Sequence, residues 1–314
     1  MRMNKFADDA SMYQIRVHEV HEKLSEVVER HIISLGLFEE HSNVARHTQE
    51  AFEEALAFVD EFYRKKDITE QNPGDKLVIL DSGCGKGLST FTIASQYPDI
   101  PVIGVDRSIN RLSKSDIFNK NDADNDNHNN NGSDNVPRNA LLLRAELANF
   151  WTLVVKESDW VVHSHYILYP NPYPKAKHVG RRWHGHPIFP YMLALGGSVK
   201  VRSNWHIYCE ETKLAAEAAL PFFPPWYASE AKASTDRYTY AIADNGKAAA
   251  SGKNGEEDVL FVPVPMTHFE RKYMHLEVPL HEARVELPRV NKLQREGILG
   301  HLRKTEAYIV DNLI

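Results

Sequence analysis

The sequence predicts an α/β fold, with a mostly parallel sheet and helices on both of its faces. The evidence lies in residues 77–106, where two short apolar runs, Leu77–Leu80 and Val102–Val105, flank a glycine-rich turn and a segment with helical spacing. Short apolar runs that are bounded by turn signals are typical of buried parallel strands. The order strand, turn, helix, strand therefore indicates a βαβ unit as the centre of the fold.

The turn after the first strand has the composition of a ligand-binding loop. It reads Ser82-Gly83-Cys84-Gly85-Lys86-Gly87 and directly follows Asp81. Glycine tolerates positive φ and lets a ligand approach the backbone closely, and ligands of open parallel sheets bind at the carboxyl ends of the strands. Asp106 ends the second strand, where a carboxylate can accept hydrogen bonds from both hydroxyls of a ribose. The pattern predicts a nucleoside ligand, although a plain βαβ turn has a similar local sequence.

Further helices and strands are expected on both sides of this unit. Residues 1–72 repeat apolar side chains at helical spacing, and Gly36 is expected to separate two helices. Residues 107–118 can form a helix after the second strand. Two more apolar runs, at residues 140–143 and 159–166, predict the third and fourth strands.

Two polar segments and a last helix complete the predicted organisation. Residues 119–135 are rich in Asn and Asp, with almost nothing to bury, and predict a disordered insert. Residues 244–258, rich in Gly, Ala, Lys and Glu, predict a mobile loop. Residues 285–314 read as an amphipathic helix. We expect a domain at residues 73–284, with the segments on either side as helical extensions.

Composition limits the class of protein. The chain has 314 residues, a formal net charge of −6 and two cysteines, Cys84 and Cys209, without a C-x-x-C motif. A disulfide framework and a zinc site are not expected, and no other metal site is predicted. No apolar run reaches the length of a membrane span and the N-terminus lacks a signal-peptide core, so a cytoplasmic location is expected. A partner subunit or a homodimer is left open.

A proline-rich segment follows the fourth strand. Pro170, Pro172 and Pro174 predict a stiff turn, and Tyr173 and Trp183 offer aromatic faces for stacking. The only dense cationic cluster of the chain comes directly after it. The cluster consists of Lys175, Lys177, His178, Arg181 and Arg182. It suits contacts with phosphates, and it equally suits a solvated loop.

Four ordered landmarks resemble the tRNA (guanine-N7-)-methyltransferase family. Residues 169–182, YPNPYPKAKHVGRR, are similar to the family signature F-P-D-P-W-x-K-x-R-H-x-x-R-R. Residues 196–208 are similar to its G-G-x-x-x-x-x-T-D-W-x-x-Y segment, and residues 267–272 to its T-x-F-E-x-R segment. Together with the glycine turn, these landmarks span residues 75–275 in the family's order.

The resemblance implies a class I methyltransferase fold, which is Rossmann-like, and S-adenosylmethionine as cofactor. In that fold the end of the third strand faces the adenine. By this resemblance, the cofactor-binding residues are Asp81, Gly83, Gly85, Asp106 and Glu146. Glu146 also suits the N-terminus of a helix, where the helix dipole favours an acid.

The resemblance also implies tRNA as substrate and Asn171 as the residue at the catalytic position. The implied substrate-binding residues are Lys175, Arg181, Arg182, Asn204, Thr267 and Glu270. Thr267 and Glu270 also suit an ordinary polar turn.

The chain departs from the family where Asn171 and Asn204 replace two acids and Tyr173 replaces a Trp. Two alternatives to a tRNA enzyme therefore stay open. One is a methyltransferase of a small molecule or protein. The other is a non-catalytic member that binds S-adenosylmethionine or RNA.

Overall fold

The computed structural model describes residues 19–40, 43–65, 75–115, 137–238, 265–275 and 278–313. The insert predicted at residues 119–135 and the loop predicted at residues 244–258 lie outside these ranges. The helices, strands and contacts of the structure belong to these ranges.

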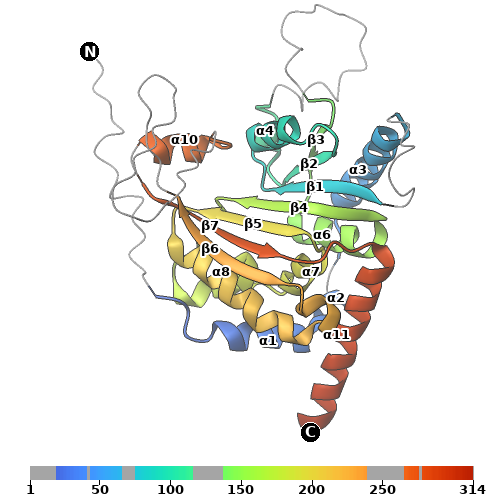
Figure 1. Cartoon of the computed structure of the whole chain (residues 1–314), viewed down its shortest axis with the longest axis vertical. Helices are drawn as coiled ribbons and strands as arrows, with labels where there is room; N and C mark the ends of the chain where they lie inside the picture. The colour runs from blue at the N-terminus through green and yellow to red at the C-terminus, as the bar shows by residue number, and fades with distance from the viewer. Residues whose placement is uncertain are drawn as a thin grey trace, which may run out of the picture.

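Seven strands form one sheet in the order β3-β2-β1-β4-β5-β7-β6 (Figure 1). Their bounds are β1 (Lys76–Ser82), β2 (Val102–Asp106), β3 (Ala140–Arg144), β4 (Trp160–Leu168), β5 (Ser198–Ser203), β6 (Lys232–Tyr238) and β7 (Leu280–Glu286). The first five strands are parallel, and β7 runs antiparallel to both β5 and β6. This mostly parallel sheet with one reversed strand has the class I methyltransferase arrangement, so the predicted fold class is confirmed.

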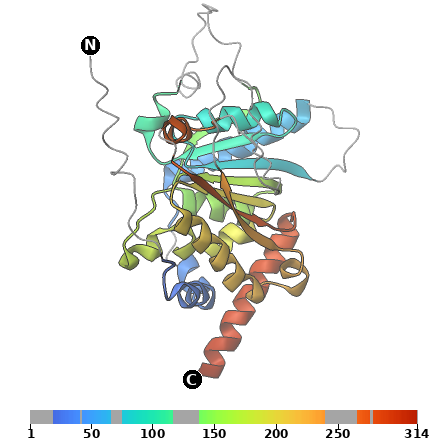
Figure 2. The same ribbon diagram turned by 60° about the vertical axis from the view of Figure 1, so that its left-hand side comes forward.

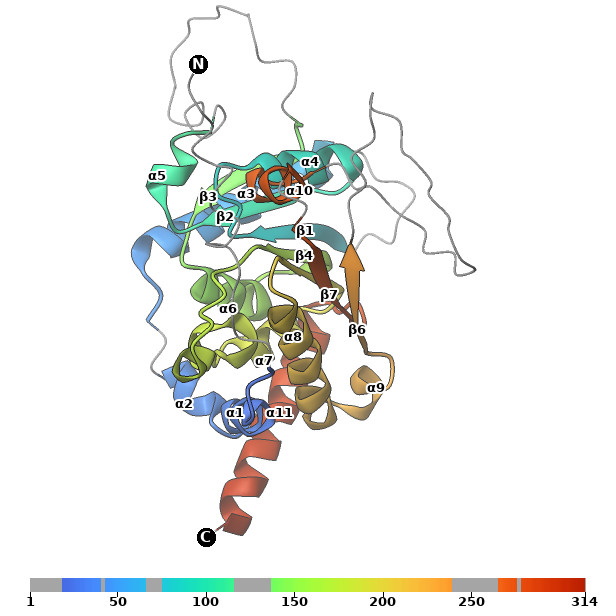
Figure 3. The same cartoon turned by 90° about the vertical axis from the view of Figure 1, so that its left-hand side faces the viewer.

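The helices cover both faces of the sheet. Their bounds are α1 (Leu24–Ile33), α2 (Leu35–Glu40), α3 (Arg46–Lys65), α4 (Leu88–Gln96), α5 (Ile109–Leu112), α6 (Leu147–Glu157), α7 (Phe189–Ala194), α8 (His206–Ala219), α9 (Pro225–Ala228), α10 (His268–His275) and α11 (Lys292–Leu313). Three short 3₁₀ segments are η2 (Ala176–Arg181), η3 (Trp183–Gly185) and η4 (Leu220–Phe222). Figure 3 shows α4 and α10 on one side of the sheet and α6, α7 and α8 on the other.

The apolar run of β1 is continuous because the sheet is buried on both faces. Val78 and Leu80 belong to the large core that the strand shares with α3, α6 and α8, whereas Ile79 packs with Ile93 of α4. Successive side chains of a strand point to opposite faces, so each core receives alternate residues of one strand.

The N-terminal helices share the main core with the sheet. Leu24, Val28 and Ile32 of α1 are buried in that core, and α1 contacts both α8 and α11. Figures 2 and 3 show the last turns of α11 projecting beyond the body of the molecule. Helix α1 and the first half of α11, which carries the buried Ile298, Leu299 and Leu302, therefore pack on the same side of the sheet.

Three predicted element boundaries are wrong. Gly36 lies inside α2, where its N–H donates to the Glu306 carboxylate at 3.0 Å, and the break falls at Ser34. The helix expected from residue 107 is α5, of only four residues. Val285 belongs to β7, opposite Val199 of β5, so the last helix begins at Lys292.

Candidate active site

A cleft of about 760 Å³ opens at the carboxyl ends of β1, β4 and β5. The strand order reverses between β1 and β4, which is the point where open α/β sheets bind their ligands. Five of the predicted site residues line the cleft together, although they come from distant parts of the chain. They are Gly83, Gly85, Asn171, Asn204 and Thr267. The volume suits a ligand of nucleoside size.

The glycine turn presents bare backbone to the cleft. Gly83 and Gly85 have φ of 85° and 62°, and a Cβ added at either would have no atom within 4 Å. The N–H groups of Gly83 and Cys84 donate to the carbonyl of Val105, at 2.7 and 3.1 Å, which ties the turn to β2. The turn is therefore fixed in position, and the space at its two glycines is open.

Asp81 supports this turn from inside the protein. The Asp81 side chain is buried and its Oδ2 accepts hydrogen bonds from the hydroxyls of Ser89 and Thr90 at 2.6 and 2.7 Å. It does not line the cleft, whereas Ser89 does. Burial raises the pKa of Asp81 to about 6, against the opposite effect of the two hydroxyl donors.

This raised pKa predicts a pH-dependent cost to folding. A carboxyl with a raised folded-state pKa stabilises the fold fully below its unfolded-state pKa, near 4, and this contribution is lost as the pH rises through about 6. The shift corresponds to about 3 kcal/mol. We expect the free energy of unfolding of Asp81→Asn, relative to the native chain, to increase by about this amount between pH 4 and 7.5.

Urea unfolding at both pH values measures this difference. The exposed Asp311 supplies the control, because Asp311→Asn changes a carboxyl that is not buried. If the difference in free energy of unfolding between Asp81→Asn and the native chain stayed constant with pH, the raised pKa of Asp81 would be contradicted.

Asp106 is also buried and occupied by protein donors. Its Oδ2 accepts from the Gly85 N–H and from Arg111 Nη1, both at 3.0 Å, and its Oδ1 accepts from the Ser108 N–H at 2.8 Å. Asp106 itself does not line the cleft, but Gly85 and Arg111 do. Glu146 precedes α6 and lies outside the cleft lining, with its N–H donating to Thr48 Oγ1 at 3.1 Å.

The proline loop has an unusual backbone at both of its ends. Tyr169 and Tyr173 are the only non-glycine residues with positive φ in the described chain, at 54° and 42°. Pro170, Asn171 and Pro172 lie between them and line the cleft. Asn171 Oδ1 accepts a hydrogen bond from the Tyr173 N–H at 3.3 Å. Such strained residues concentrate at functional sites, where the surrounding structure holds them.

Three aromatic rings that the sequence analysis missed line the cleft beside this loop. Phe269 lies near Tyr169 and Tyr273, with ring centroids 6.1 and 6.3 Å away and interplanar angles of 27° and 23°. Phe269 is 55% exposed. Tyr173 and Trp183, predicted as stacking faces, do not line the cleft, and Trp183 packs against Trp151 with ring centroids 4.7 Å apart. The missed signal was the aromatic spacing of residues 269 and 273 on one helix face.

Thr267 and Glu270 begin helix α10 with a capping contact. Thr267 Oγ1 accepts from the Glu270 N–H at 3.0 Å, so the polar-turn reading of this pair describes their local geometry. The Glu270 carboxylate is fully buried and accepts from Tyr169 Oη, Arg202 Nη1 and the Met266 N–H. Thr267 faces the cleft, while Glu270 anchors α10 and the ring of Tyr169 from behind.

The cationic segment divides into exposed and buried members. Lys175 and Arg181 are exposed, and the Arg181 guanidinium lies 5.9 Å from the ring of Tyr173. Arg182 is only 2% exposed and forms an ion pair with Glu211. The expectation that Arg182 contacts substrate is not matched by its position, because its guanidinium faces the protein interior.

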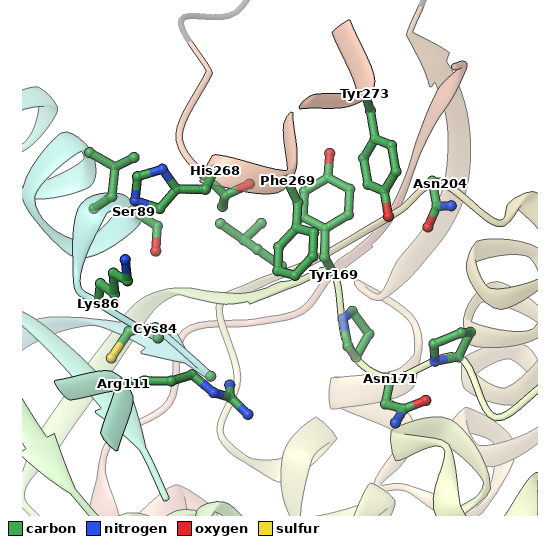
Figure 4. A pocket seen from close by; sticks show the side chains of 17 residues that line it. Cys84, Lys86, Ser89, Arg111, Tyr169, Asn171, Asn204, His268, Phe269 and Tyr273 are labelled. Carbon is green, nitrogen blue, oxygen red and sulfur yellow. The ribbon is translucent and has the colours of Figure 1, made fainter. Parts of the chain in front are cut away.

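Charge is distributed unevenly around the cleft. Figure 4 shows Lys86 and Arg111 on one side and Asn171 and Asn204 on the other. Among the described residues that line the cleft, none is an Asp or a Glu. In the same described part of the chain, no group of three or more His, Cys, Asp or Glu side chains is arranged to hold a metal ion. No described helix is long and apolar enough to cross a membrane.

Two of the solved structures that match this chain are methyltransferases of low sequence identity. The 16S rRNA methyltransferase KamB is 17% identical, with a TM-score of 0.42. The match covers 68% of this chain and 90% of the KamB chain. The plantazolicin methyltransferase BamL, solved with a triazolic desmethylPZN analogue and SAH, is 13% identical, with a TM-score of 0.36, and the match covers 87% of this chain and 100% of that chain.

Sequence comparison identifies the family directly. A family described as "Putative methyltransferase" matches residues 75–236, which include β1 through most of β6. A curated tRNA (guanine-N(7)-)-methyltransferase of Clostridium beijerinckii is 34% identical over 110 residues, which are 34% of this chain and 45% of that protein. This chain thus spans less than half the length of that curated relative. The chain belongs to this methyltransferase family, and the resemblance to the tRNA (guanine-N7-)-methyltransferases is confirmed.

Proposed function

We propose that this protein transfers a methyl group from S-adenosylmethionine to N7 of a guanine in tRNA. The observation that carries the proposal is one cleft in which the glycine turn of β1 faces the proline loop of β4. The curated relative that acts on tRNA guanine supports the choice of substrate. The catalytic domain expected at residues 73–284 would extend through β7 to Glu286, with residues 1–72 as one helical extension and α11 as the other.

The glycine turn fits S-adenosylmethionine. The open space at Gly83 and Gly85 would admit the cofactor against the backbone, and any larger residue would fill it. When bound, the cofactor supplies an electrophilic methyl group on a sulfonium. Lys86 and Arg111 offer cations to its carboxylate. Asp81 and Asp106 would act by holding the turn, because both are buried and bonded to it or to the helix that follows.

The opposite side of the cleft suits a planar base. Phe269 and Tyr273 offer aromatic faces, and base–aromatic stacking contributes about 1–3 kcal/mol per base. The side-chain amides of Asn171 and Asn204 provide both donors and acceptors to read the base edge. Thr267 adds a hydroxyl from the cap of α10.

The lining of the cleft agrees with a reaction that requires no strong base. Guanine N7 carries a lone pair and can attack a methyl group without losing a proton. The site then has to align the two reactants, and alignment alone supplies a large part of many rate enhancements. The absence of carboxylates among the described lining residues is compatible with this chemistry.

Exposed cations next to the proline loop suit the phosphates of a folded RNA. Lys175, Lys177 and Arg181 lie on or beside η2, directly after the loop that carries Asn171. In a chain of net charge −6, such a local cluster would direct the RNA to this edge of the cleft. A tRNA substrate is compatible with the cytoplasmic location expected from the sequence.

A substrate other than tRNA is the second candidate. Two amides, Asn171 and Asn204, stand where the family has acids, and burial of Arg182 removes one cation from the surface. Both features favour a small molecule or protein substrate, or a non-catalytic role that keeps cofactor or RNA binding.

Methyl transfer from labelled S-adenosylmethionine to unmodified bulk tRNA, followed by nucleoside analysis, tests the proposal. We expect 7-methylguanosine, at a rate that falls steeply with added salt because phosphate contacts release counterions. Cofactor binding without label in any RNA would overturn the tRNA proposal and favour the second candidate.

A further inference from the structure

A buried ion pair lies beside both segments that bring amides to the cleft. Arg182 is 2% exposed and Glu211, on α8, is fully buried. Arg182 Nη1 donates to Glu211 Oε2 in a close ion pair. A charged pair so far from water persists only where its remaining donors and acceptors are also satisfied.

The first segment is the proline loop. Arg182 Nε and Nη2 both donate to the carbonyl oxygen of Tyr173, at 3.2 and 3.1 Å. Tyr173 has φ of 42° and ends the loop, and its N–H donates to Asn171 Oδ1. The guanidinium therefore holds the strained residue to which the amide of Asn171 is bonded.

The second segment follows β5. The Arg182 guanidinium carbon lies 5.0 Å from the centroid of the Trp205 ring. Trp205 is 3% exposed and directly follows Asn204, which lines the cleft. One guanidinium thus donates two hydrogen bonds to Tyr173, two residues after Asn171. It also makes a cation–π contact with Trp205, the residue after Asn204.

Glu211 holds this guanidinium in place and is itself anchored. His184 Nε2 lies 2.9 Å from Glu211 Oε2, and the His21 N–H donates to Glu211 Oε1 at 2.9 Å. Burial would raise the pKa of Glu211, but the hydrogen bonds and charges of His184 and Arg182 lower it on balance, so the side chain is a carboxylate. The backbone of His21, which precedes α1, thereby supports the site from outside the proposed catalytic domain.

We propose that Arg182 is a positioning residue, which fixes the Asn171 and Asn204 segments relative to each other while Glu211 holds its guanidinium. It does not bind phosphate. Lysine cannot replace it, because only a planar fork can donate twice to one carbonyl, pair with a carboxylate and stack on a ring. The kinetic test of this role rests on the proposed function, because it measures tRNA methylation.

Two variants test this role. One is the single substitution Arg182→Lys, and the other is the double substitution Arg182→Met with Glu211→Gln. The first keeps the charge and loses the fork, and the second removes both charges so that no carboxylate is left buried without its partner. We expect kcat for tRNA methylation to fall about 10-fold to 100-fold, because small misplacements of reacting groups have effects of this size. The KM for tRNA and the salt dependence of binding should stay within about twofold of the native values, since no phosphate contact is lost.

Arg295 provides the matched control. It is a fully buried arginine on α11 that donates to the carbonyls of Val155, Trp160 and Ser158, at the amino end of β4, whereas the cleft lies at the carboxyl end of that strand. Arg295→Lys should lower thermal stability without changing kcat of the folded protein.

Amide hydrogen exchange followed by mass spectrometry supplies a readout without substrate. Arg182→Lys should accelerate exchange in peptides that span residues 168–174 and 203–208, whereas Arg295→Lys should not. Unchanged exchange in those peptides, or a changed salt dependence with native kcat, would overturn the inference. If the native chain methylates no tRNA, the proposed function fails, and the exchange result alone still decides the role of Arg182.

Discussion

Alanine at Gly83 or Gly85 is expected to weaken binding of S-adenosylmethionine about 100-fold or more, equivalent to about 2.7 kcal/mol. At both positions φ is positive, and a Cβ would project into open space of the cleft instead of meeting another atom of the protein. The new methyl group would occupy the volume that the cofactor requires next to the backbone. The strain of a non-glycine residue at positive φ adds about 1 kcal/mol to the cost of folding.

Gly87 offers the contrasting control in the same turn. It has φ of 84°, but a Cβ there would lie 2.5 Å from Leu142 Cδ1, inside the protein. Gly87→Ala should therefore lower the melting temperature more than Gly83→Ala or Gly85→Ala. Equilibrium binding of the cofactor and thermal unfolding separate the two effects. Native affinity in both Gly83→Ala and Gly85→Ala would show that the cofactor binds elsewhere.

Asn171→Ala is expected to lower kcat/KM for the RNA substrate about 100-fold, the scale found when one polar group at a reacting centre is removed. The substitution removes the amide from the cleft and the acceptor of the Tyr173 N–H, which helps to hold the loop. Affinity for S-adenosylmethionine should stay near the native value, because the glycine turn is untouched.

Asn171→Asp separates the two roles of this amide. It retains the acceptor for the Tyr173 N–H and adds a negative charge to a cleft whose described lining has no carboxylate. We expect it to keep activity on guanine, because a carboxylate stabilises the positive charge of the methylated ring. Equal loss of activity in Asn171→Asp and Asn171→Ala would contradict a hydrogen-bonding role for the oxygen, and native activity in both would exclude Asn171 from the reaction.

Local sequence signals predict the centre of this protein well. The turn from Asp81 to Gly87 and the strands β1 and β2 follow from apolar runs and glycines, which act over a few residues. The resemblance to the family implies catalytic or substrate-binding roles for Asn171, Asn204 and Thr267, and all three line one cleft. The apolar and glycine pattern covers a few consecutive residues, and the family motifs are read directly along the sequence. Neither prediction requires knowledge of contacts between distant residues.

Burial of charged residues could not be predicted in the same way. Arg182 and Glu270 read as surface residues, because their partners Glu211 and Arg202 lie 29 and 68 positions away. The aromatic group around Phe269 likewise joins α10 to the end of β4 across about 100 residues of sequence, as the separation of 101 between Tyr169 and Glu270 indicates. Contacts of this kind depend on the tertiary fold, which no short pattern encodes.

The proline after Asn171 has a further consequence, for the chemical ageing of the protein. Asparagine deamidates when the backbone nitrogen of the next residue attacks the side-chain amide, and Pro172 carries no N–H to begin that attack. At Asn204 the next nitrogen, that of Trp205, is buried and donates to Ser203 Oγ at 3.0 Å. We therefore expect both amides to deamidate slowly in stored protein, so that a sample does not gain acids at these two positions of the family signature.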